Sequence, residues 1–207
     1  MSIERKEHWE RLYNSVEIDK VGWYQEKPET SLYFFNKLEL PKNANIIDVG
    51  GGAYFFVDYL LEAGYKNITV LDISETALQT TKNRLADKAN MIKWIVNDIT
   101  EFKPVENYYL WHDRAVFHFL TSEADRRKYV KSLSDSLLPN GHFILGTFSV
   151  DGPKKCSGLE ICQYSETSVN KVFGDFFVQH ETLRVDHITP SGAIQNFLYA
   201  HFIRKGD

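Results

Sequence analysis

A run of three glycines behind a short apolar segment, at residues 46–52, constrains the fold of this chain more than any other feature. Ile46, Ile47 and Val49 suit a buried strand, and a helical pattern follows from about residue 54. Glycine lets a backbone turn sharply and lets a ligand approach without a Cβ in the way. A glycine turn between a buried strand and a helix N-terminus is typical of sites for nucleotide-like cofactors.

Two cofactors suit such a turn, a dinucleotide and S-adenosylmethionine. The dinucleotide fingerprint G-x-G-x-x-G needs a third glycine where this chain has Phe55, which argues against a nicotinamide cofactor. An acidic residue two positions before the first glycine, as in Asp48-Val49-Gly50-Gly51-Gly52, resembles motif I of class I S-adenosylmethionine-dependent methyltransferases. The motif alone does not decide between the two cofactors. The residues that follow the later strands distinguish them.

Strands and helices alternate from residue 45 onward. The pattern predicts strands at 45–49, 68–71, 92–96, 108–111 and 142–147, with helices at 54–63, 74–86, 122–138 and 165–173. Two final strands, at about 176–184 and 195–203, have no helix between them and are expected to form an antiparallel pair. The predicted fold is therefore α/β, a doubly wound, Rossmann-like, seven-stranded sheet. It is mostly parallel with a C-terminal antiparallel pair, in the strand order 3-2-1-4-5-7-6.

One domain is expected over residues 1–207, with a helical extension at 1–43 in front of a core at 44–207. Residues 2–14 have the pattern of an amphipathic helix that carries Trp9 and Tyr13, and Trp23 lies in the loop that follows. Exposed tryptophan is costly unless something covers it. We therefore predict that the extension is a lid that faces the ligand; the alternative is a helix that only packs against the core.

Polar side chains follow several of the predicted strands. Asp72 comes 22 residues after Gly50, close to the spacing of about 20 for a ribose-binding carboxylate. Its neighbour Ile73 precedes Ser74, so the alternative is an aspartate that helps to start the next helix. Asp98 follows the third strand and is a candidate acceptor for an adenine amino group, with Ile99 packed on the ring. The alternative for Asp98 is a turn residue.

The order of these motifs resembles class I S-adenosylmethionine-dependent methyltransferases over about residues 44–148. The matching segments are Asp48-Val49-Gly50-Gly51-Gly52, Asp72, Asn97-Asp98-Ile99 and Pro139-Asn140-Gly141-His142-Phe143. The aromatic head and the Trp111-His112-Asp113-Arg114 segment look like a bacterial branch near the thiopurine, tellurite-resistance and protein-lysine methyltransferases. The resemblance implies S-adenosyl-L-methionine as the cofactor and S-adenosyl-L-homocysteine as the product. One departure is Tyr54, where the family often has a small residue beside the methionine part of the cofactor.

The reaction implied is an in-line displacement on a sulfonium, for which positioning contributes about 7–11 kcal/mol. Trp9, Tyr13 and Trp23 are expected to cover the sulfonium, because aromatic faces attract cations. Asp113 and Arg114 follow the fourth predicted strand, where we expect them within reach of the acceptor. Asp113 would orient or deprotonate it and Arg114 would clamp an acidic group, with His112 as a third catalytic candidate. A structural ion pair between Asp113 and Arg114 is the alternative.

Composition narrows the class of partner. A net charge of −4 and a pI near 6.0 give no basic surface, which disfavours nucleic acid. The N-terminus lacks a secretory signal, and no run of about 18 apolar residues suggests a membrane span. Cys156 and Cys162 match neither a zinc spacing nor a disulfide framework, so we predict no metal and a cytoplasmic location. The sequence leaves the oligomeric state open.

We predict methyl transfer to a small molecule, because aromatic residues and a 15-residue loop at 149–163 would enclose a pocket. Whether oxygen, nitrogen or sulfur is methylated stays open. The first alternative is a protein-lysine methyltransferase, for which Asp113, Glu160 and Asp186 would have to converge in an acidic groove. The second is a non-catalytic protein that binds S-adenosylmethionine, and Tyr54 is the only support for it.

Overall fold

The computed structural model of the protein describes residues 3–206, so residue 2, where the predicted N-terminal helix begins, lies outside the described residues. The helices are α1 (Ile3–Ser15), α2 (Glu29–Asn36), α3 (Phe56–Glu62), α4 (Glu75–Leu85), α5 (Glu123–Ser136) and α6 (Glu166–Phe173), with short 3-10 turns η1 (Ile18–Lys20), η2 (Ala86–Met91) and η3 (Phe117–Phe119). The strands are β1 (Asn45–Val49), β2 (Asn67–Asp72), β3 (Ile92–Val96), β4 (Tyr108–Arg114), β5 (Leu137–Phe148), β6 (Lys155–Cys156), β7 (Leu159–Glu160), β8 (Phe177–Ile188) and β9 (Ile194–Arg204).

The predicted seven-stranded sheet is confirmed, in the order β3-β2-β1-β4-β5-β9-β8. Since β8 and β9 are the sixth and seventh predicted strands, this is the predicted order 3-2-1-4-5-7-6. β1 pairs in parallel with β2 on one side and with β4 on the other. The strand order therefore reverses at β1, with β2 and β3 on one side of it and β4 and β5 on the other. β9 is antiparallel to both β5 and β8. The two-residue strands β6 and β7 pair only with each other, within the loop predicted at 149–163.

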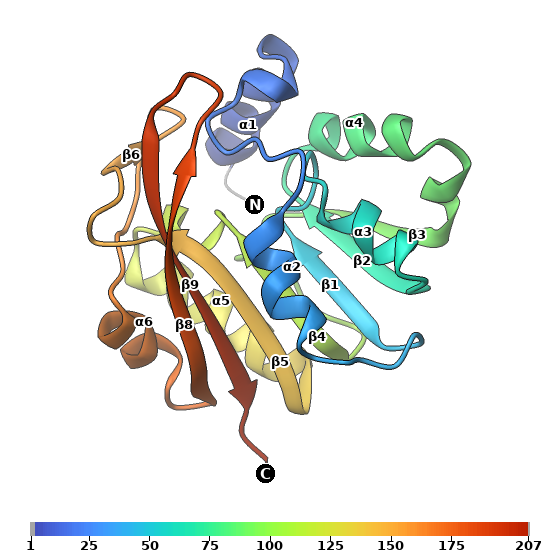
Figure 1. Cartoon of the computed structure of the whole chain (residues 1–207), viewed down its shortest axis with the longest axis vertical. Helices are drawn as coiled ribbons and strands as arrows, with labels where there is room; N and C mark the ends of the chain where they lie inside the picture. The colour runs from blue at the N-terminus through green and yellow to red at the C-terminus, as the bar shows by residue number, and fades with distance from the viewer. Residues whose placement is uncertain (1–2, 207) are drawn as a thin grey trace.

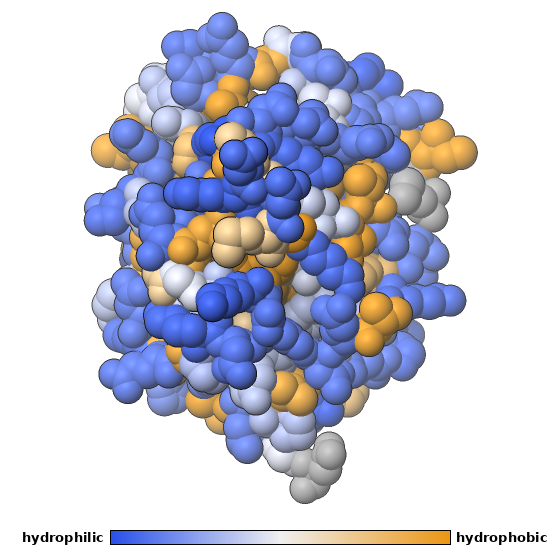
Figure 2. All heavy atoms as spheres, turned by 90° about the vertical axis from the view of Figure 1, so that its right-hand side faces the viewer, coloured by the Kyte–Doolittle hydropathy of each residue, from blue (hydrophilic) through white to orange (hydrophobic). Residues whose placement is uncertain are grey.

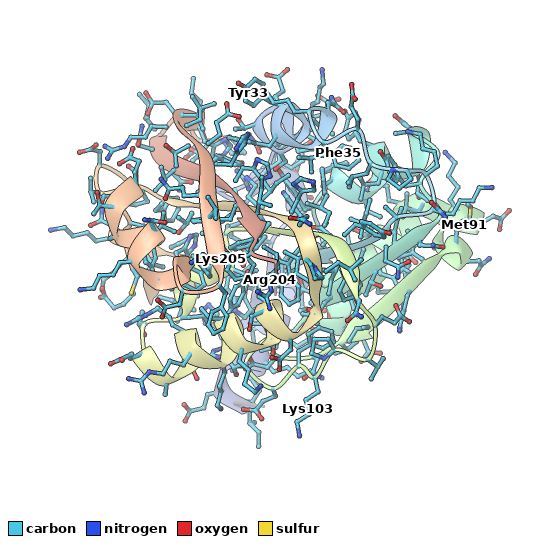
Figure 3. The ribbon with its side chains drawn as sticks, turned by 90° about the horizontal axis from the view of Figure 1, so that it is seen from below. Tyr33, Phe35, Met91, Lys103, Arg204 and Lys205 are labelled. Atoms are coloured by element: carbon cyan, nitrogen blue, oxygen red, sulfur yellow. The ribbon has the colours of Figure 1, made fainter. Side chains whose placement is uncertain are left out.

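Helices cover both faces of this sheet (Figure 1). α2, α3 and α4 pack on one face, where Phe34, Phe56 and Leu78 belong to one buried cluster. α5 and α6 pack on the other face, where Tyr129 and Phe173 belong to a second cluster. In the view from below, Phe35 of α2 points into the molecule and Tyr33 lies at its periphery (Figure 3). This inward and outward alternation fits an amphipathic helix over a sheet.

Two helices begin at the serines that the sequence indicates. The Ser74 hydroxyl accepts a hydrogen bond from the backbone N–H of Ala77 at 3.1 Å, and the Ser122 hydroxyl accepts from that of Asp125 at 3.1 Å. Each serine satisfies one of the backbone donors that a helix N-terminus leaves open. Figure 2 shows the side of the molecule that carries α4 and β3, where most residues are hydrophilic and hydrophobic residues gather in separate patches.

The predicted ends of one strand and of one helix are wrong, and the end of the strand affects the site. β4 continues through His112, Asp113 and Arg114, which the sequence analysis placed in a turn after a strand at 108–111. The helix predicted at 122–138 ends at Ser136 instead, and the segment around Asn140, with a φ of 61°, lies at the irregular start of β5. The continuation of β4 imposes strand geometry on its last three residues, so that their side chains alternate between the faces of the sheet.

Candidate functional site

A cavity lies at the carboxyl ends of β1, β2, β3 and β4, beneath α1. Its wall includes the predicted cofactor residues Gly50, Asp72, Ile73, Asp98 and Ile99. Ligands of doubly wound sheets bind at this position, outside the strand ends where the order of strands reverses. We call it the first cavity.

The glycine turn has little room for side chains. Gly50 has a φ of 72°, and a Cβ there would collide with the side chain of Val116. A Cβ on Gly51 would collide with the Asp48 carboxylate. A Cβ on Gly52 would lie 2.5 Å from Asp72 Oδ2 and 2.7 Å from the Cβ of Ala77. Only Gly50 of the three lines the first cavity; Gly51 and Gly52 instead allow two carboxylates to approach the turn.

Asp72 connects the turn to the helix that follows it. Its carboxylate accepts from the backbone N–H of Gly52 at 3.0 Å and from that of Ser74 at 2.8 Å. Because a carboxylate offers about four acceptor positions, both oxygens can still accept from ribose hydroxyls. Burial raises the pKa of Asp72 to about 6. The two readings of the sequence coexist here, since Asp72 braces the start of α4 and also lines the first cavity.

We expect Asp72→Ala to weaken binding of S-adenosylhomocysteine by about 1.5–3 kcal/mol, the usual contribution of hydrogen bonds to a charged group. Isothermal calorimetry measures the loss. Asp135→Ala, which removes an exposed carboxylate from α5, is the matched control and should leave the affinity unchanged. Wild-type affinity in a folded Asp72→Ala variant would reduce Asp72 to a residue that only starts the helix.

Affinity for the same ligand should depend on pH through Asp72. The ribose hydroxyls donate hydrogen bonds, so the ionised carboxylate binds and protonation removes an acceptor. With the pKa of Asp72 raised to about 6, affinity rises with pH through about 6 and is level above it. We expect affinity at pH 5 to be roughly tenfold lower than at pH 7.5. Calorimetry of Asp72→Asn should show this dependence flattened; an equally steep profile in that variant would assign it to another group.

Asp98 is engaged by the N-terminal helix. Arg5 Nη1 donates to both oxygens of Asp98, at 3.0 and 3.1 Å, and Arg5 Nη2 donates to Asp125 at 2.8 Å. Asp98 Oδ1 also accepts from the backbone and the hydroxyl of Thr100. Asp98 therefore lies on the cavity wall as expected, but it is also the residue to which α1 is fastened. Its role toward adenine stays a prediction, as does that of Ile99.

The aromatic residues of the extension cover the mouth of the first cavity. Trp9, Tyr13 and Trp23 all line it. The Trp9 ring meets those of Trp23 and Phe119 edge to face, with centroids 5.9 and 5.0 Å apart. Glu10, on the same helix, accepts from the backbone N–H groups of Glu75 and Thr76 at 2.7 and 3.2 Å. α1 thus lies over the cavity and is fastened at the N-terminus of α4.

Asp48 and His112 lie beneath the turn and away from the cavity. Asp48 Oδ1 and His112 Nδ1 are 2.6 Å apart, and His112 Nε2 is 2.8 Å from the Ser31 hydroxyl. His112 is fully buried, does not line the first cavity and has both ring nitrogens engaged, so its position does not support the expectation that it is catalytic. Asp48 Oδ2 has no hydrogen-bond partner within residues 3–206. Asp48 supports the turn from below, and a direct contact with the cofactor stays a prediction.

Asp113 points to the face of the sheet that α5 covers and does not line the first cavity. Its carboxylate accepts from the Tyr129 hydroxyl at 2.7 Å and from the backbone N–H of Val116 at 3.0 Å. Burial raises its pKa to about 6. The expected reach of Asp113 to the acceptor is therefore wrong, and so is the alternative ion pair. Because Asp113 and Arg114 are neighbours on one strand, their side chains leave on opposite faces.

We expect Asp113→Asn to lower stability and to leave turnover of the folded protein near normal. An amide cannot accept from Tyr129 with both of its ends, so one buried hydrogen bond to a charged group is lost, at about 1.5–3 kcal/mol. Chemical denaturation gives the loss in the free energy of unfolding, and methyl transfer is assayed on the same sample. A fall in turnover of 100-fold or more with unchanged stability would restore Asp113 as a catalytic residue.

Arg114 is the one predicted catalytic residue that reaches the cavity. Its side chain is only 6% exposed. Nε donates to the Tyr199 hydroxyl at 3.0 Å and Nη1 donates to the carbonyl of Trp23 at 3.0 Å. The guanidinium also lies over the ring of Tyr54, 5.0 Å from its centroid. Within residues 3–206, Nη2 has no hydrogen-bond partner and no carboxylate lies within ion-pair distance of the guanidinium.

A second cavity, of about 1200 Å³ including its wide mouth, lies between the loop before α2 and the strands β8 and β9. Arg114 lines both cavities. Tyr24, Phe197 and Tyr199 form part of the wall of the second cavity. Arg114 is the residue that the two linings share.

Arg5 and Cys156 line the first cavity but were not identified from the sequence as site residues, and neither was Glu10, which fastens α1 beside the cavity. Arg5 and Glu10 carry no motif, because their partners lie more than 60 residues away. Tyr54 lines the first cavity and donates from its hydroxyl to Gln25 at 2.9 Å, so it occupies the wall without closing the space. Cys156, from the loop at 149–163, also lines the cavity, and burial raises the pKa of its thiol, which disfavours a thiolate nucleophile.

The described part of the chain holds no group of three or more His, Cys, Asp or Glu side chains arranged to bind a metal ion. That the protein binds no metal ion stays a prediction. Among the helices in residues 3–206, none has both the length and the apolar character to cross a membrane. The first cavity suits an adenosine-like ligand, since the Asp72 carboxylate accepts two backbone hydrogen bonds and has acceptor positions to spare.

Comparisons with known proteins agree with this geometry. A family model described as a methyltransferase domain matches residues 46–141. EEF1A lysine methyltransferase 2 of Homo sapiens is 27% identical over 159 residues, which cover 70% of this chain and 67% of that protein. A lysine methyltransferase among the relatives agrees with one of the three branches named from the sequence.

Solved structures show the same fold. N-methyltransferase NodS from Bradyrhizobium japonicum WM9, in complex with S-adenosylhomocysteine, is similar with a TM-score of 0.73 and 19% identity, over 96% of this chain and 99% of that one. The 1,6-didemethyltoxoflavin-N1-methyltransferase of Burkholderia thailandensis, also with bound S-adenosylhomocysteine, has a TM-score of 0.70 and 18% identity, over 86% of this chain and 78% of that one.

Proposed function

The chain belongs to the class I S-adenosylmethionine-dependent methyltransferases, and we propose that it methylates a small molecule bound beside Arg114, which lines both of its cavities. The observation that carries the proposal is the position of Arg114. Its guanidinium is buried, forms part of both walls and keeps Nη2 without a partner in residues 3–206. An acceptor in the second cavity would meet it at the end nearest the first cavity.

S-adenosylmethionine, when bound, supplies a methyl group on an electrophilic sulfonium. Asp72 would accept hydrogen bonds from its ribose, and Ile73 and Ile99 would pack against its base. Trp9, Tyr13 and Trp23 would exclude water from above. The chain would thus contribute positioning and exclusion of water.

We further propose that residues 1–43 act as the lid of a single domain whose core is 44–207. Arg5 and Glu10 support this, because they fasten α1 to strand-end and helix-start groups of the core. A cytoplasmic location is proposed as well, since Cys156 and Cys162 are both free.

A protein-lysine acceptor is the second candidate, and the mouth of the second cavity favours it. The acidic groove expected from Asp113, Glu160 and Asp186 does not form, because Asp113 is buried behind the sheet and Glu160 lies on β7. A different set of carboxylates surrounds the mouth: Asp19, Glu26, Glu29 and Asp186. The human relative is named a lysine methyltransferase, which agrees with this candidate.

Methyl-labelled S-adenosylmethionine and a cell extract, separated by size before the reaction, test the proposal. We expect label in the low-mass fraction when the protein is added and none when it is omitted. Label on one protein band, retained after treatment with a nuclease, would favour the second candidate. An absence of label in every fraction, from protein that binds S-adenosylhomocysteine, would count against both acceptors.

A further inference from the structure

The end of the second cavity nearest the first carries a buried positive charge without a negative partner. Arg114 is 6% exposed, and its hydrogen bonds go to a hydroxyl and a backbone carbonyl. A buried charge is costly unless it is paired. The two hydrogens of Nη2 have no acceptor within residues 3–206. A guanidinium in this state is complemented best by an anionic group such as a carboxylate.

The opposite end of the cavity carries the reverse charge. Asp19, Glu26, Glu29 and Asp186 line the mouth, and all four are exposed. Lysines offset part of this charge: Lys27 lies 3.9 Å from Glu29, and Lys20 lies 3.6 Å from Asp19. Glu26 and Asp186 have no ion-pair partner among the described residues. The mouth therefore attracts cations, although exposed carboxylates do so weakly.

We propose that the second cavity binds a zwitterionic acceptor of the aminocarboxylate class, with its carboxylate on Arg114 and its ammonium group at the mouth, beside Glu26 and Asp186. This inference rests on the proposed function and specifies the acceptor. The aromatic walls formed by Tyr24, Phe197 and Tyr199 suit the apolar stem between the two charges. The reacting atom would lie beside the carboxylate end, next to Arg114, which also lines the first cavity.

Ligands whose charges are all of one sign complement the cavity only in part. A diamine would satisfy the mouth but bring its inner ammonium group toward Arg114. A dianion would satisfy Arg114 but leave its outer charge among carboxylates. The carboxylate of the cofactor is the other source of an anion for Arg114, because the guanidinium lines the first cavity as well. The experiment must separate these sources.

Three probes of equal length test the proposal: 6-aminohexanoate, hexanoate and 1,6-diaminohexane. Each is titrated by calorimetry or NMR into protein saturated with S-adenosylhomocysteine, so the cofactor carboxylate is already present. We expect 6-aminohexanoate to bind about threefold tighter than hexanoate, the contribution of an exposed ion pair. We expect 1,6-diaminohexane to bind at least about tenfold more weakly than 6-aminohexanoate. A preference for the diamine, or no binding of any probe, overturns the proposal.

Substitutions test which residues bind the carboxylate end and the ammonium end of the probe. Arg114→Gln should weaken 6-aminohexanoate and hexanoate by about tenfold or more while affinity for S-adenosylhomocysteine stays within about twofold. Arg114→Lys, which keeps the charge without the planar fork, should retain part of the affinity and serves if the Gln variant does not fold. Glu26→Gln combined with Asp186→Asn should abolish the preference for 6-aminohexanoate over hexanoate. Lys171→Gln, on the exposed side of α6, is the charge control.

The alternatives give different results. A tenfold loss of S-adenosylhomocysteine affinity in Arg114→Gln, with probe binding unchanged, assigns the guanidinium to the cofactor and overturns the proposal. Unchanged binding of every ligand in both Arg114 variants would mean that Arg114 only packs within the protein, and this result also overturns the proposal. Failure of the proposed function is a separate result, because it appears as a lack of low-mass label in the extract assay while the probes still bind.

Discussion

Deletion of residues 1–27 is expected to leave a folded sheet whose methyl transfer is reduced by about 100-fold or more. The helix α1 contributes no buried residue to the core, so most of the apolar packing survives its loss. The deletion removes Trp9, Tyr13 and Trp23 from the first cavity, which admits water and loosens the bound ligands. Misplacement of about 1 Å in a reacting pair can cost 100-fold in rate. Circular dichroism and the labelled transfer assay measure the two expectations on one sample.

Point variants separate closure of the lid from loss of its aromatic side chains. Arg5→Gln combined with Glu10→Gln unfastens α1 from Asp98, Asp125 and the start of α4 but keeps every aromatic residue. We expect faster dissociation of S-adenosylhomocysteine in stopped-flow measurements. Arg11→Gln, on the exposed side of the same helix, is the matched control. Full activity of the truncated protein would mean that the segment only packs against the core.

The order of the sheet was predictable because the signals for it are local. Each parallel strand is a short apolar run, and the polar residue that follows it marks the end at which ligands bind, as Asp72 and Asp98 do. Gly50 marks the turn, because a φ of 72° excludes most other residues. The absence of a helix between the last two strands predicts their antiparallel pairing.

The directions of the side chains at the end of β4 were not predictable. The predicted strand ends at residue 111, and β4 continues three residues further, to Arg114. Because the faces of a strand alternate, the length of the strand decides which of His112, Asp113 and Arg114 meets the ligand. Arg114 lines the first cavity, and Asp113 accepts a hydrogen bond from the Tyr129 hydroxyl on the α5 side of the sheet. His112, Asp113 and Arg114 are all polar, so no alternation of polar and apolar residues shows which side chain lies on which face of the sheet.

The contacts of the lid were not predictable for a different reason. Arg5 lies 93 residues from Asp98 and 120 from Asp125, and Glu10 lies 65 from Glu75. A charged residue on an amphipathic helix can also lie on a solvated face, so its presence alone does not reveal a distant partner. The aromatic residues of the same helix gave a usable signal because their exposure is costly, whereas exposed charge is not.

Gly52→Ala is expected to weaken binding of S-adenosylhomocysteine by about 100-fold or more, which is about 2.7 kcal/mol. A Cβ at this position would lie 2.5 Å from Asp72 Oδ2 and 2.7 Å from the Cβ of Ala77, far inside van der Waals contact. The turn must therefore move away from the start of α4. That movement breaks the hydrogen bond from the Gly52 N–H to Asp72 and displaces the carboxylate that would hold the ribose.

The loss in Gly52→Ala should exceed that in Asp72→Ala, because the substitution displaces the turn as well as the carboxylate. Gly64→Ala is the control for backbone strain. Gly64 has a φ of 85°, and a Cβ there would meet no atom within 4 Å, so the variant should lose about 1–2 kcal/mol of stability and keep its affinity. Calorimetry and thermal unfolding of both variants separate the two effects. Affinity of Gly52→Ala within about threefold of wild type would show that the turn adapts, and would remove the close approach of Gly52 to Asp72 from the explanation of cofactor binding.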